Sequence, residues 1–171
     1  ASENINWHFI PAKAPHMGGM WENGVKSCKH HLRRVMGNII FTFEELYTLL
    51  VQIESILNSR PLSPMSSDPN DYSPLTPSHF LLGRAVTSLP DPDITDVKIN
   101  RLNRFQLIQQ IQQHFWNRWQ KEYISQFQQR HKWKENQLDI RVNDLVFIKE
   151  DNLPPKQWIL GRVCKLYPGS D

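Results

Sequence analysis

The chain has 171 residues, 39% of them hydrophobic, and a formal net charge of +3, which suits one domain or two small ones with a modest apolar core. No apolar run approaches the roughly 18 residues that mark a membrane-spanning helix, so we expect no membrane span. Cys28 and Cys164 lie far apart without a zinc-ligand spacing, which argues against a structural zinc site and favours a reducing, intracellular setting.

Positive charge is concentrated in the third quarter of the chain. Residues 98–134 hold eight Lys and Arg against one acidic residue, whereas residues 63–97 hold five Asp against one Arg. Aromatic side chains are interleaved with the cations of the basic segment, a pattern that is compatible with nucleic-acid contact. A solvated helix whose aromatic side chains pack inward is the alternative interpretation.

The beginning of the chain predicts a short strand, a hinge and a helix. Residues Ile5–Phe9 alternate between apolar and polar, as the residues of a half-buried strand do. Pro15 fixes the entry of the following loop, while Gly18 and Gly19 leave it mobile. A basic helix is expected to begin near Met20.

One face of this helix combines a carboxylate with three cations. At 3.6 residues per turn, a single stripe holds Glu22, Lys26, Lys29 and Arg33. A separate apolar stripe is available for a core and consists of Val25, Cys28, Leu32, Val35 and Met36. The polar stripe suits a metal ion acting on a phosphodiester whose backbone the cations grip. A solvated face with an ordinary i,i+4 Glu–Lys pair is the alternative.

A second helix has the clearest pattern in the chain. Thr42 and Glu45 form a predicted capping box, and apolar residues recur at helical spacing from Leu46 to Leu57. The helix is expected to end before Pro61, and its apolar stripe indicates a core element without catalytic groups.

A proline-rich loop and a short helix come next. The segment 61–77 is rich in Pro, Ser and Asp and predicts a loop. Thr76 and Pro77 can cap a short helix over residues 79–82 that Gly83 closes. For His79, which has no plausible partner as a metal ligand, we expect a packing or capping role.

A long helix is predicted over residues 102–134, after an acidic, proline-containing linker at 87–101. Its apolar residues form one narrow seam, made by Phe105, Ile108, Ile111, Phe115, Trp119, Tyr123 and Phe127. Nine glutamines between Gln106 and Gln129 are expected to keep the other faces polar. Such a helix can bridge two domains, pair with another protomer, or break near Trp119 and fold back.

In the tail, apolar and polar residues alternate with a period of two, which is typical of β-strands. Residues 138–142 alternate, Asn143 and Asp144 predict a turn, and residues 145–149 predict a β-rich strand. A loop with two prolines follows. Residues 158–167 then predict another strand, with a bulge at Gly161.

Four groups of motifs, in this order, resemble the end of the integrase catalytic core and the region after it in BEL/Pao-type LTR retrotransposons. The first comprises Trp7-His8-Phe9-Ile10-Pro11, Ala14-Pro15-His16 and Gly18-Gly19-Met20-Trp21-Glu22. The second and third are Leu57-Asn58-Ser59-Arg60-Pro61-Leu62 and Leu75-Thr76-Pro77-Ser78-His79-Phe80-Leu81-Leu82-Gly83-Arg84. The fourth is Asp151-Asn152-Leu153-Pro154-Pro155 with Trp158-Ile159-Leu160-Gly161-Arg162-Val163. The resemblance therefore covers nearly all of the chain.

The resemblance implies an α+β fold that is mainly helical. Residues 1–86 would be the C-terminal part of an RNase H-like catalytic core, and residues 87–101 the acidic linker. Residues 102–134 would form the long linking helix. Residues 135–171 would be a truncated SH3-like DNA-binding domain, whose open strand edges should leave it marginally stable alone.

The function that the resemblance implies is that of a DDE integrase, a polynucleotidyl transferase that inserts element cDNA into host DNA. Glu22 would be the last acid of the triad and would hold Mg²⁺ or Mn²⁺ with two upstream aspartates. Residues 1–21 contain no Asp, so we expect a fragment that is inactive alone and binds no metal by itself.

The resemblance also implies DNA contacts and partners. Gly18 and Gly19 would form the hinge loop. The candidate DNA contacts are Lys26, Lys29, Arg33, Arg141, Lys149, Lys156, Arg162 and Lys165. The complete enzyme would be a homo-oligomer that binds cDNA ends and target DNA, first in a cytoplasmic particle and then in the nucleus.

Two non-enzymatic functions stay open from the sequence. The chain could be a nucleic-acid-binding remnant that uses the basic 98–134 region and the tail. It could also be an interaction protein whose 102–133 helix mediates self-association.

Overall fold

The computed structural model describes residues 19–87, 91–127, 140–151 and 153–167, together with Phe9, Pro11 and Met17. Its helices and small antiparallel sheets make an α+β fold, as predicted. The chain forms two compact units, residues 1–37 and 38–171. This division differs from the predicted boundaries at residues 86 and 134, because segments from both sides of those boundaries pack together in the second unit.

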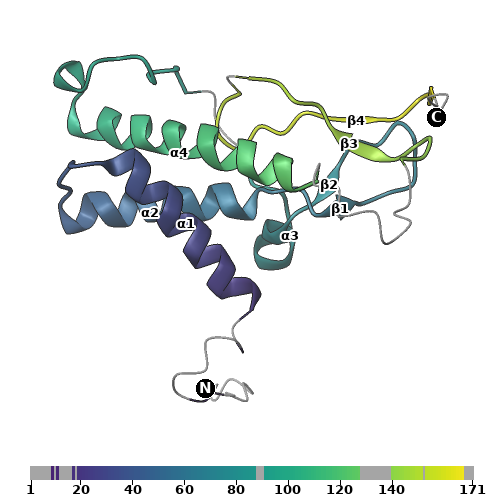
Figure 1. Ribbon diagram of the computed structural model, residues 1–171, viewed down its shortest axis with the longest axis horizontal. Helices are drawn as coiled ribbons and strands as arrows, with labels where there is room; N and C mark the ends of the chain where they lie inside the picture. Colours follow the sequence, from purple (N-terminus) through teal and green to yellow (C-terminus); the bar gives the residue numbers. More distant parts are fainter. Residues whose placement is uncertain are drawn as a thin grey trace. The chain divides into compact units, whose positions relative to one another are not determined.

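The first unit contains helix α1, which spans Met20–Met36 and confirms the predicted basic helix (Figure 1). Glycines flank the helix at both ends. Gly19 has φ of 49° and Gly37 has φ of 53°, a left-handed backbone conformation that glycine adopts without a steric penalty. The predicted strand lies outside the described residues except for Phe9, and so does Gly18 of the predicted hinge.

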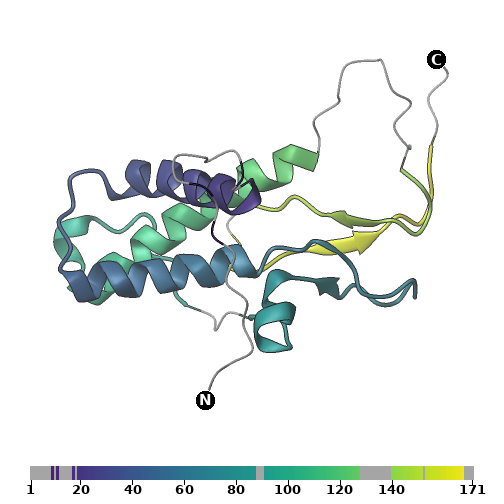
Figure 2. The ribbon, with the colours of Figure 1, turned by 90° about the horizontal axis from the view of Figure 1, so that it is seen from below.

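The core of the second unit is a pair of helices, α2 (Phe43–Asn58) and α4 (Arg104–Phe127), which pack side by side (Figures 1 and 2). The capping box of α2 is confirmed, since the Thr42 N–H donates to Glu45 Oε2 at 2.8 Å and the Glu45 N–H donates to Thr42 Oγ1 at 3.3 Å. Leu49, Ile53 and Ile56 of α2 are fully buried. Burial of each such side chain contributes about 1.5–3 kcal/mol.

Helix α4 continues through Trp119 without a break, and residues 128–139 lie outside the described part of the chain. Its glutamines differ from the prediction, because four of them are buried: Gln110, Gln112, Gln113 and Gln120. The Gln110 Nε2 atom donates to the carbonyl oxygens of Ile94 and Val97 at 2.8 and 2.7 Å. Amide side chains carry both donors and acceptors, so they can satisfy the backbone of a loop packed across the helix.

The predicted loop at residues 61–77 contains a small hairpin. Strands β1 (Ser63–Pro64) and β2 (Pro74–Leu75) are antiparallel, with Ser63 opposite Leu75. Two-residue strands are too short to leave a periodic pattern in a sequence.

The short helix α3 (Pro77–Leu82) follows the hairpin, and Gly83 caps it with a left-handed φ of 72°. The capping role of His79 is confirmed, because the Thr76 N–H donates to its Nδ1 atom at 3.0 Å. A 3₁₀ turn, η2 (Ile99–Arg101), then leads into α4.

The tail forms a second antiparallel hairpin from β3 (Leu145–Phe147) and β4 (Leu160–Arg162). The predicted bulge at Gly161 is wrong, since Gly161 pairs in regular register with Val146. A Cβ atom at this position would lie 2.9 Å from the Cδ1 atom of Ile148, which packs across the strand.

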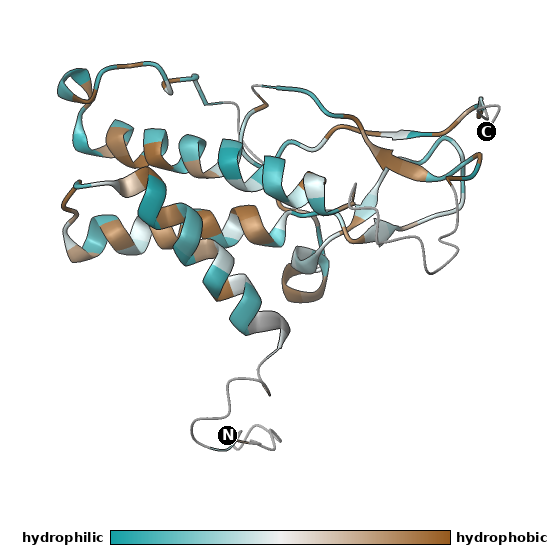
Figure 3. Ribbon diagram, in the orientation of Figure 1, coloured by the Kyte–Doolittle hydropathy of each residue, from teal (hydrophilic) through white to brown (hydrophobic). Residues whose placement is uncertain are grey.

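An aromatic cluster joins this hairpin to the helices. The Trp158 ring lies 4.9 Å from Trp116, 5.6 Å from Tyr123 and 5.6 Å from Phe147, measured between ring centroids. The polar atoms of the same rings bind backbone or side-chain oxygens, for example Trp116 Nε1 to the Leu153 carbonyl at 2.8 Å. Figure 3 shows hydrophobic residues recurring along α2, α4 and β3. The hairpin is thus part of the same core as the helices.

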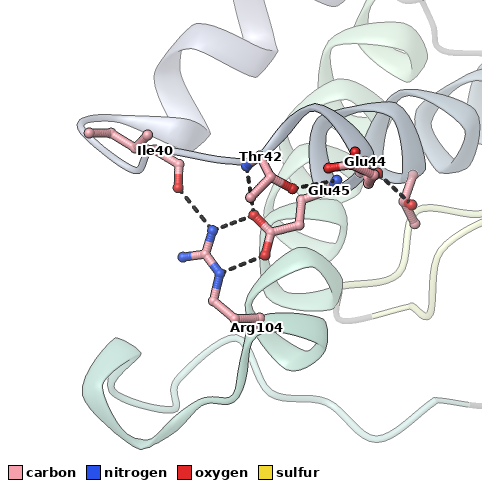
Figure 4. Close-up of polar contacts among 6 residues, drawn as sticks. Ile40, Thr42, Glu44, Glu45 and Arg104 are labelled. Carbon is pink, nitrogen blue, oxygen red and sulfur yellow. Dashed lines mark hydrogen bonds and ion pairs between the residues drawn. The ribbon is translucent and has the colours of Figure 1, made fainter.

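The N-terminal ends of α2 and α4 are tied by an ion pair between Arg104 and Glu45. Arg104 Nε donates to Glu45 Oε1 at 2.7 Å, and Arg104 Nη2 donates to the Ile40 carbonyl at 3.0 Å (Figure 4). The hydrogen bond from Arg104, followed by that from the Thr42 backbone, lowers the pKa of Glu45 from 4.5 to about 2.

A change of Arg104 to Met should therefore reduce the dependence of stability on pH under acidic conditions. A carboxyl group whose pKa is lowered by folding contributes stability that is fully present above its unfolded pKa of 4.5 and is lost as the pH falls through about 2. Urea unfolding of both proteins across this interval measures the difference. The exposed Arg118 of α4, changed to Met, is the matched control. An unchanged pH profile in the Arg104 variant would show that the pair contributes nothing.

Candidate functional site

The polar stripe of α1 has the charge arrangement that the sequence predicted. Glu22 lies in the first turn and is half-buried, while Lys26, Lys29 and Arg33 are exposed along the following turns. An acidic side chain in a first turn is favoured by the partial positive charge of the helix N-terminus. The stripe therefore presents three cations to solvent on one helix, with its only carboxylate at the N-terminal end.

The alternative interpretation of this stripe is a solvated face with an i,i+4 ion pair between Glu22 and Lys26. No such pair forms, and Lys29 and Arg33 also make no hydrogen bond or ion pair within the described part of the chain. Arg34 differs from them, because its Nη1 atom lies 2.7 Å from the Nδ1 atom of His30. Within the described ranges, three exposed cations of α1 thus have no anionic partner.

The described residues do not by themselves form a metal site. Among them, no group of three or more His, Cys, Asp or Glu side chains is arranged to hold an ion. Glu22 supplies one carboxylate, whereas a site of the DDE kind would hold its divalent cations with two aspartates in addition. Burial raises the pKa of the Cys28 thiol on the same helix, which disfavours the thiolate form that binds metal ions.

The candidate DNA contacts of the tail fall into two groups. Arg141, Lys149 and Lys165 are exposed, and the Lys165 Nζ atom lies 4.9 Å above the centre of the Tyr167 ring. Lys156 is half-buried with a φ of 70°, and burial lowers its pKa. The exposed group resembles the α1 cations in being open to solvent.

Arg162 has a structural position that the sequence does not reveal. Its guanidinium donates to the carbonyl oxygens of Asp71, Asn143 and Ser66 at distances between 2.7 and 3.0 Å. These bonds join β4 to the loop after β1 and to the turn before β3, and they use the donors that a phosphate would need. The contacts therefore support a structural role for this side chain rather than DNA binding.

Comparison with known proteins gives one match. A family described as being of unknown function (DUF5641) matches residues 103–171. No curated protein and no solved structure was found to match the chain. The matched segment contains α4, β3 and β4, and it includes Trp158, which meets the aromatic side chains of α4 and β3 in the cluster. No helix in the described ranges is both long and apolar enough to cross a membrane.

Proposed function

We propose that this chain is the DNA-binding C-terminal portion of an integrase-type polynucleotidyl transferase. Its first part would be the end of an RNase H-like catalytic core, and its last part would be related to an SH3-like domain. Helix α1 would lie along the phosphate backbone of a DNA end. The observation that carries the proposal is the stripe of solvent-exposed cations that follows Glu22 on α1.

The order of the sequence motifs supports the same proposal. The proline- and glycine-containing segment before Glu22 is followed by three further motif groups in the order that the retrotransposon integrases have. In those enzymes the acid after the glycine loop is catalytic, so Glu22 is the proposed catalytic carboxylate. Gly19, which has a positive φ, is the N-cap of α1 and would be the end of the proposed hinge.

Strand transfer requires more acidic metal ligands than the described residues provide. Two further carboxylates would have to join Glu22 before Mg²⁺ or Mn²⁺ could be held, and no Asp precedes Glu22 in residues 1–21. What the residues of α1 can do alone is bind and orient. Lys26, Lys29 and Arg33 would neutralise phosphates, which positions the backbone beside Glu22.

The test is DNA binding by the chain with Lys26 and Lys29 both changed to Gln. Each phosphate contact releases counterions, so loss of two contacts should lower the slope of log affinity against log salt by about two units. Fluorescence anisotropy with a labelled duplex at several salt concentrations measures this slope.

The matched control is the chain with Lys98 and Arg101 changed to Gln. Both side chains are exposed and lie in the second unit, and they belong to the basic segment 98–134 that the non-enzymatic alternative uses. A slope that falls only in this control would support the binding remnant and contradict the role proposed for α1.

A further inference from the structure

All Ser-Pro and Thr-Pro dipeptides of the chain lie in the segment around the β1–β2 hairpin. They are Ser63-Pro64, Ser73-Pro74 and Thr76-Pro77. A hydroxyl residue followed by proline is the minimal acceptor sequence of proline-directed protein kinases, which transfer a phosphoryl group to Ser or Thr. None of these dipeptides takes part in the function proposed above, so their accessibility to a kinase can be considered separately.

The hydroxyl of Thr76 is protected by the fold. Thr76 is 2% exposed, and its Oγ1 atom lies 2.7 Å from Ser78 Oγ and 2.9 Å from His79 Nδ1. These contacts belong to the cap at the start of α3. A kinase can therefore reach this hydroxyl only when the start of α3 unfolds locally.

Ser63 has the opposite environment. It is exposed in β1, as are its neighbours Leu62 and Pro64, and its hydroxyl makes no hydrogen bond within the described part of the chain. Local sequence does not account for this difference, because Pro61-Leu62-Ser63-Pro64 and Pro74-Leu75-Thr76-Pro77 differ only in the hydroxyl residue. The fold thus opens one of two nearly identical sequences and closes the other.

Ser73 is intermediate between these two cases. It is exposed, but its N–H donates to Asp71 Oδ1 at 2.8 Å, and Pro74 is half-buried. Hydrogen bonds from the Ser73 backbone, and then from its hydroxyl, lower the pKa of Asp71. The hydroxyl would have to give up its bond to the carboxylate before it could be phosphorylated. Ser73 is therefore expected to react more slowly than Ser63.

We propose that Ser63 is a phosphorylation site for a proline-directed protein kinase. In this reaction the Ser63 Oγ atom attacks the γ-phosphorus of ATP, the bond from that phosphorus to the bridging oxygen breaks, and ADP leaves. The hydroxyl proton passes to the catalytic aspartate of the kinase. The proposal is independent of DNA binding by α1, because Ser63 lies in the second unit.

A phosphate on Ser63 would border a groove between the two hairpins, which lie side by side (Figures 1 and 2). The groove has a volume of about 450 Å³, and its lining includes Ser63 and Pro64 of β1 and Leu145 and Phe147 of β3. Asp144 is the one charged residue among the described lining residues. A phosphate carries about −1.5 to −2 charges at pH 7, so it would meet apolar surface and a like charge. Phosphorylation should therefore loosen the packing of the β3–β4 hairpin against β1.

Incubation of the full chain with a mitogen-activated protein kinase and Mg-ATP, followed by peptide mass spectrometry, tests the site. Ser63 should be phosphorylated at least about 100-fold faster than Thr76, because the latter reacts only through local unfolding. Pro64→Ala should abolish the reaction at Ser63, since it keeps the hydroxyl but removes the proline that the kinase recognises.

Short peptides of the two sequences provide the unfolded reference. They should be phosphorylated at similar rates, which would show that the fold protects Thr76. An unmodified Ser63, or equal rates for Ser63 and Thr76 in the folded chain, overturns the proposal.

Thermal unfolding of the phosphorylated chain measures the effect on packing. We expect the midpoint to fall by about 3–6 °C, a shift of the size that one weakened contact gives in a domain of this length. The shift should be smaller in Asp144→Asn, which lacks the like charge, and absent in kinase-treated Ser63→Ala. If the phosphorylated wild-type chain keeps its midpoint, the proposed effect on the hairpins is wrong.

Discussion

Replacement of Trp116 by Ala is expected to lower the free energy of unfolding of the second unit by about 3–5 kcal/mol. Trp116 has no exposed surface and contacts both Trp119 and Trp158, at centroid distances of 6.3 and 4.9 Å. Its removal leaves a cavity between α4 and the β3–β4 hairpin and an unbound carbonyl at Leu153. Urea unfolding followed by far-UV circular dichroism and by tryptophan fluorescence measures the loss.

Two further variants refine this result. Trp116→Phe keeps most of the ring but loses the hydrogen bond to Leu153, so it should cost clearly less than Trp116→Ala. Phe105→Ala lies on the same helix at a position that is 58% exposed, and it should change stability little.

The same experiment decides whether the tail is a domain of its own. If the hairpin and the helices share one core, the two probes should report a single transition that shifts as a whole. The sequence instead predicted a separate SH3-like domain at residues 135–171. Two separate transitions, with only the tail affected by Trp116→Ala, would favour that division over the one seen in the structure.

A change of Glu22 to Gln should abolish strand transfer in a protein that combines this chain with the two further carboxylates of a DDE site. Glutamine keeps the size of the side chain and its place in the first turn of α1, but it lacks the charge that a divalent metal ligand needs. DNA affinity should stay nearly the same, because the cations of the stripe are retained. An oligonucleotide strand-transfer assay and anisotropy measure the two properties separately.

The matched control for Glu22 is Glu44, which lies in the first turn of α2 and is exposed. Glu44→Gln should leave both strand transfer and DNA affinity unchanged. Strand transfer that survives in the Glu22 variant would remove the catalytic role proposed for this residue. Reduced DNA affinity in that variant would instead indicate that Glu22 supports the structure of the binding face.

Local chemistry was sufficient to predict the helices and several of their caps. The capping box of Thr42 and Glu45 involves residues three apart, and the cap formed by His79 has the same span. Periodicity located α1, α2 and most of α4 because each buries or exposes one face at 3.6 residues per turn. The charge stripe of α1 follows from the same period.

Only the tertiary structure decided the roles that depend on distant partners. The side chain of Gln110 is buried because its amide donates hydrogen bonds to the backbone of a loop some 15 residues away in sequence. Arg162 donates to carbonyl oxygens more than 90 residues away. The middle of the α4 seam, including Phe115 and Trp119, is buried within the chain, whereas Phe105 and Phe127 at its ends are exposed, a difference that periodicity does not reveal. The sequence thus determines which face of a helix or strand must be buried. Which segment covers that face depends on long-range packing, because the hydrophobic effect is non-directional and does not select one apolar partner over another.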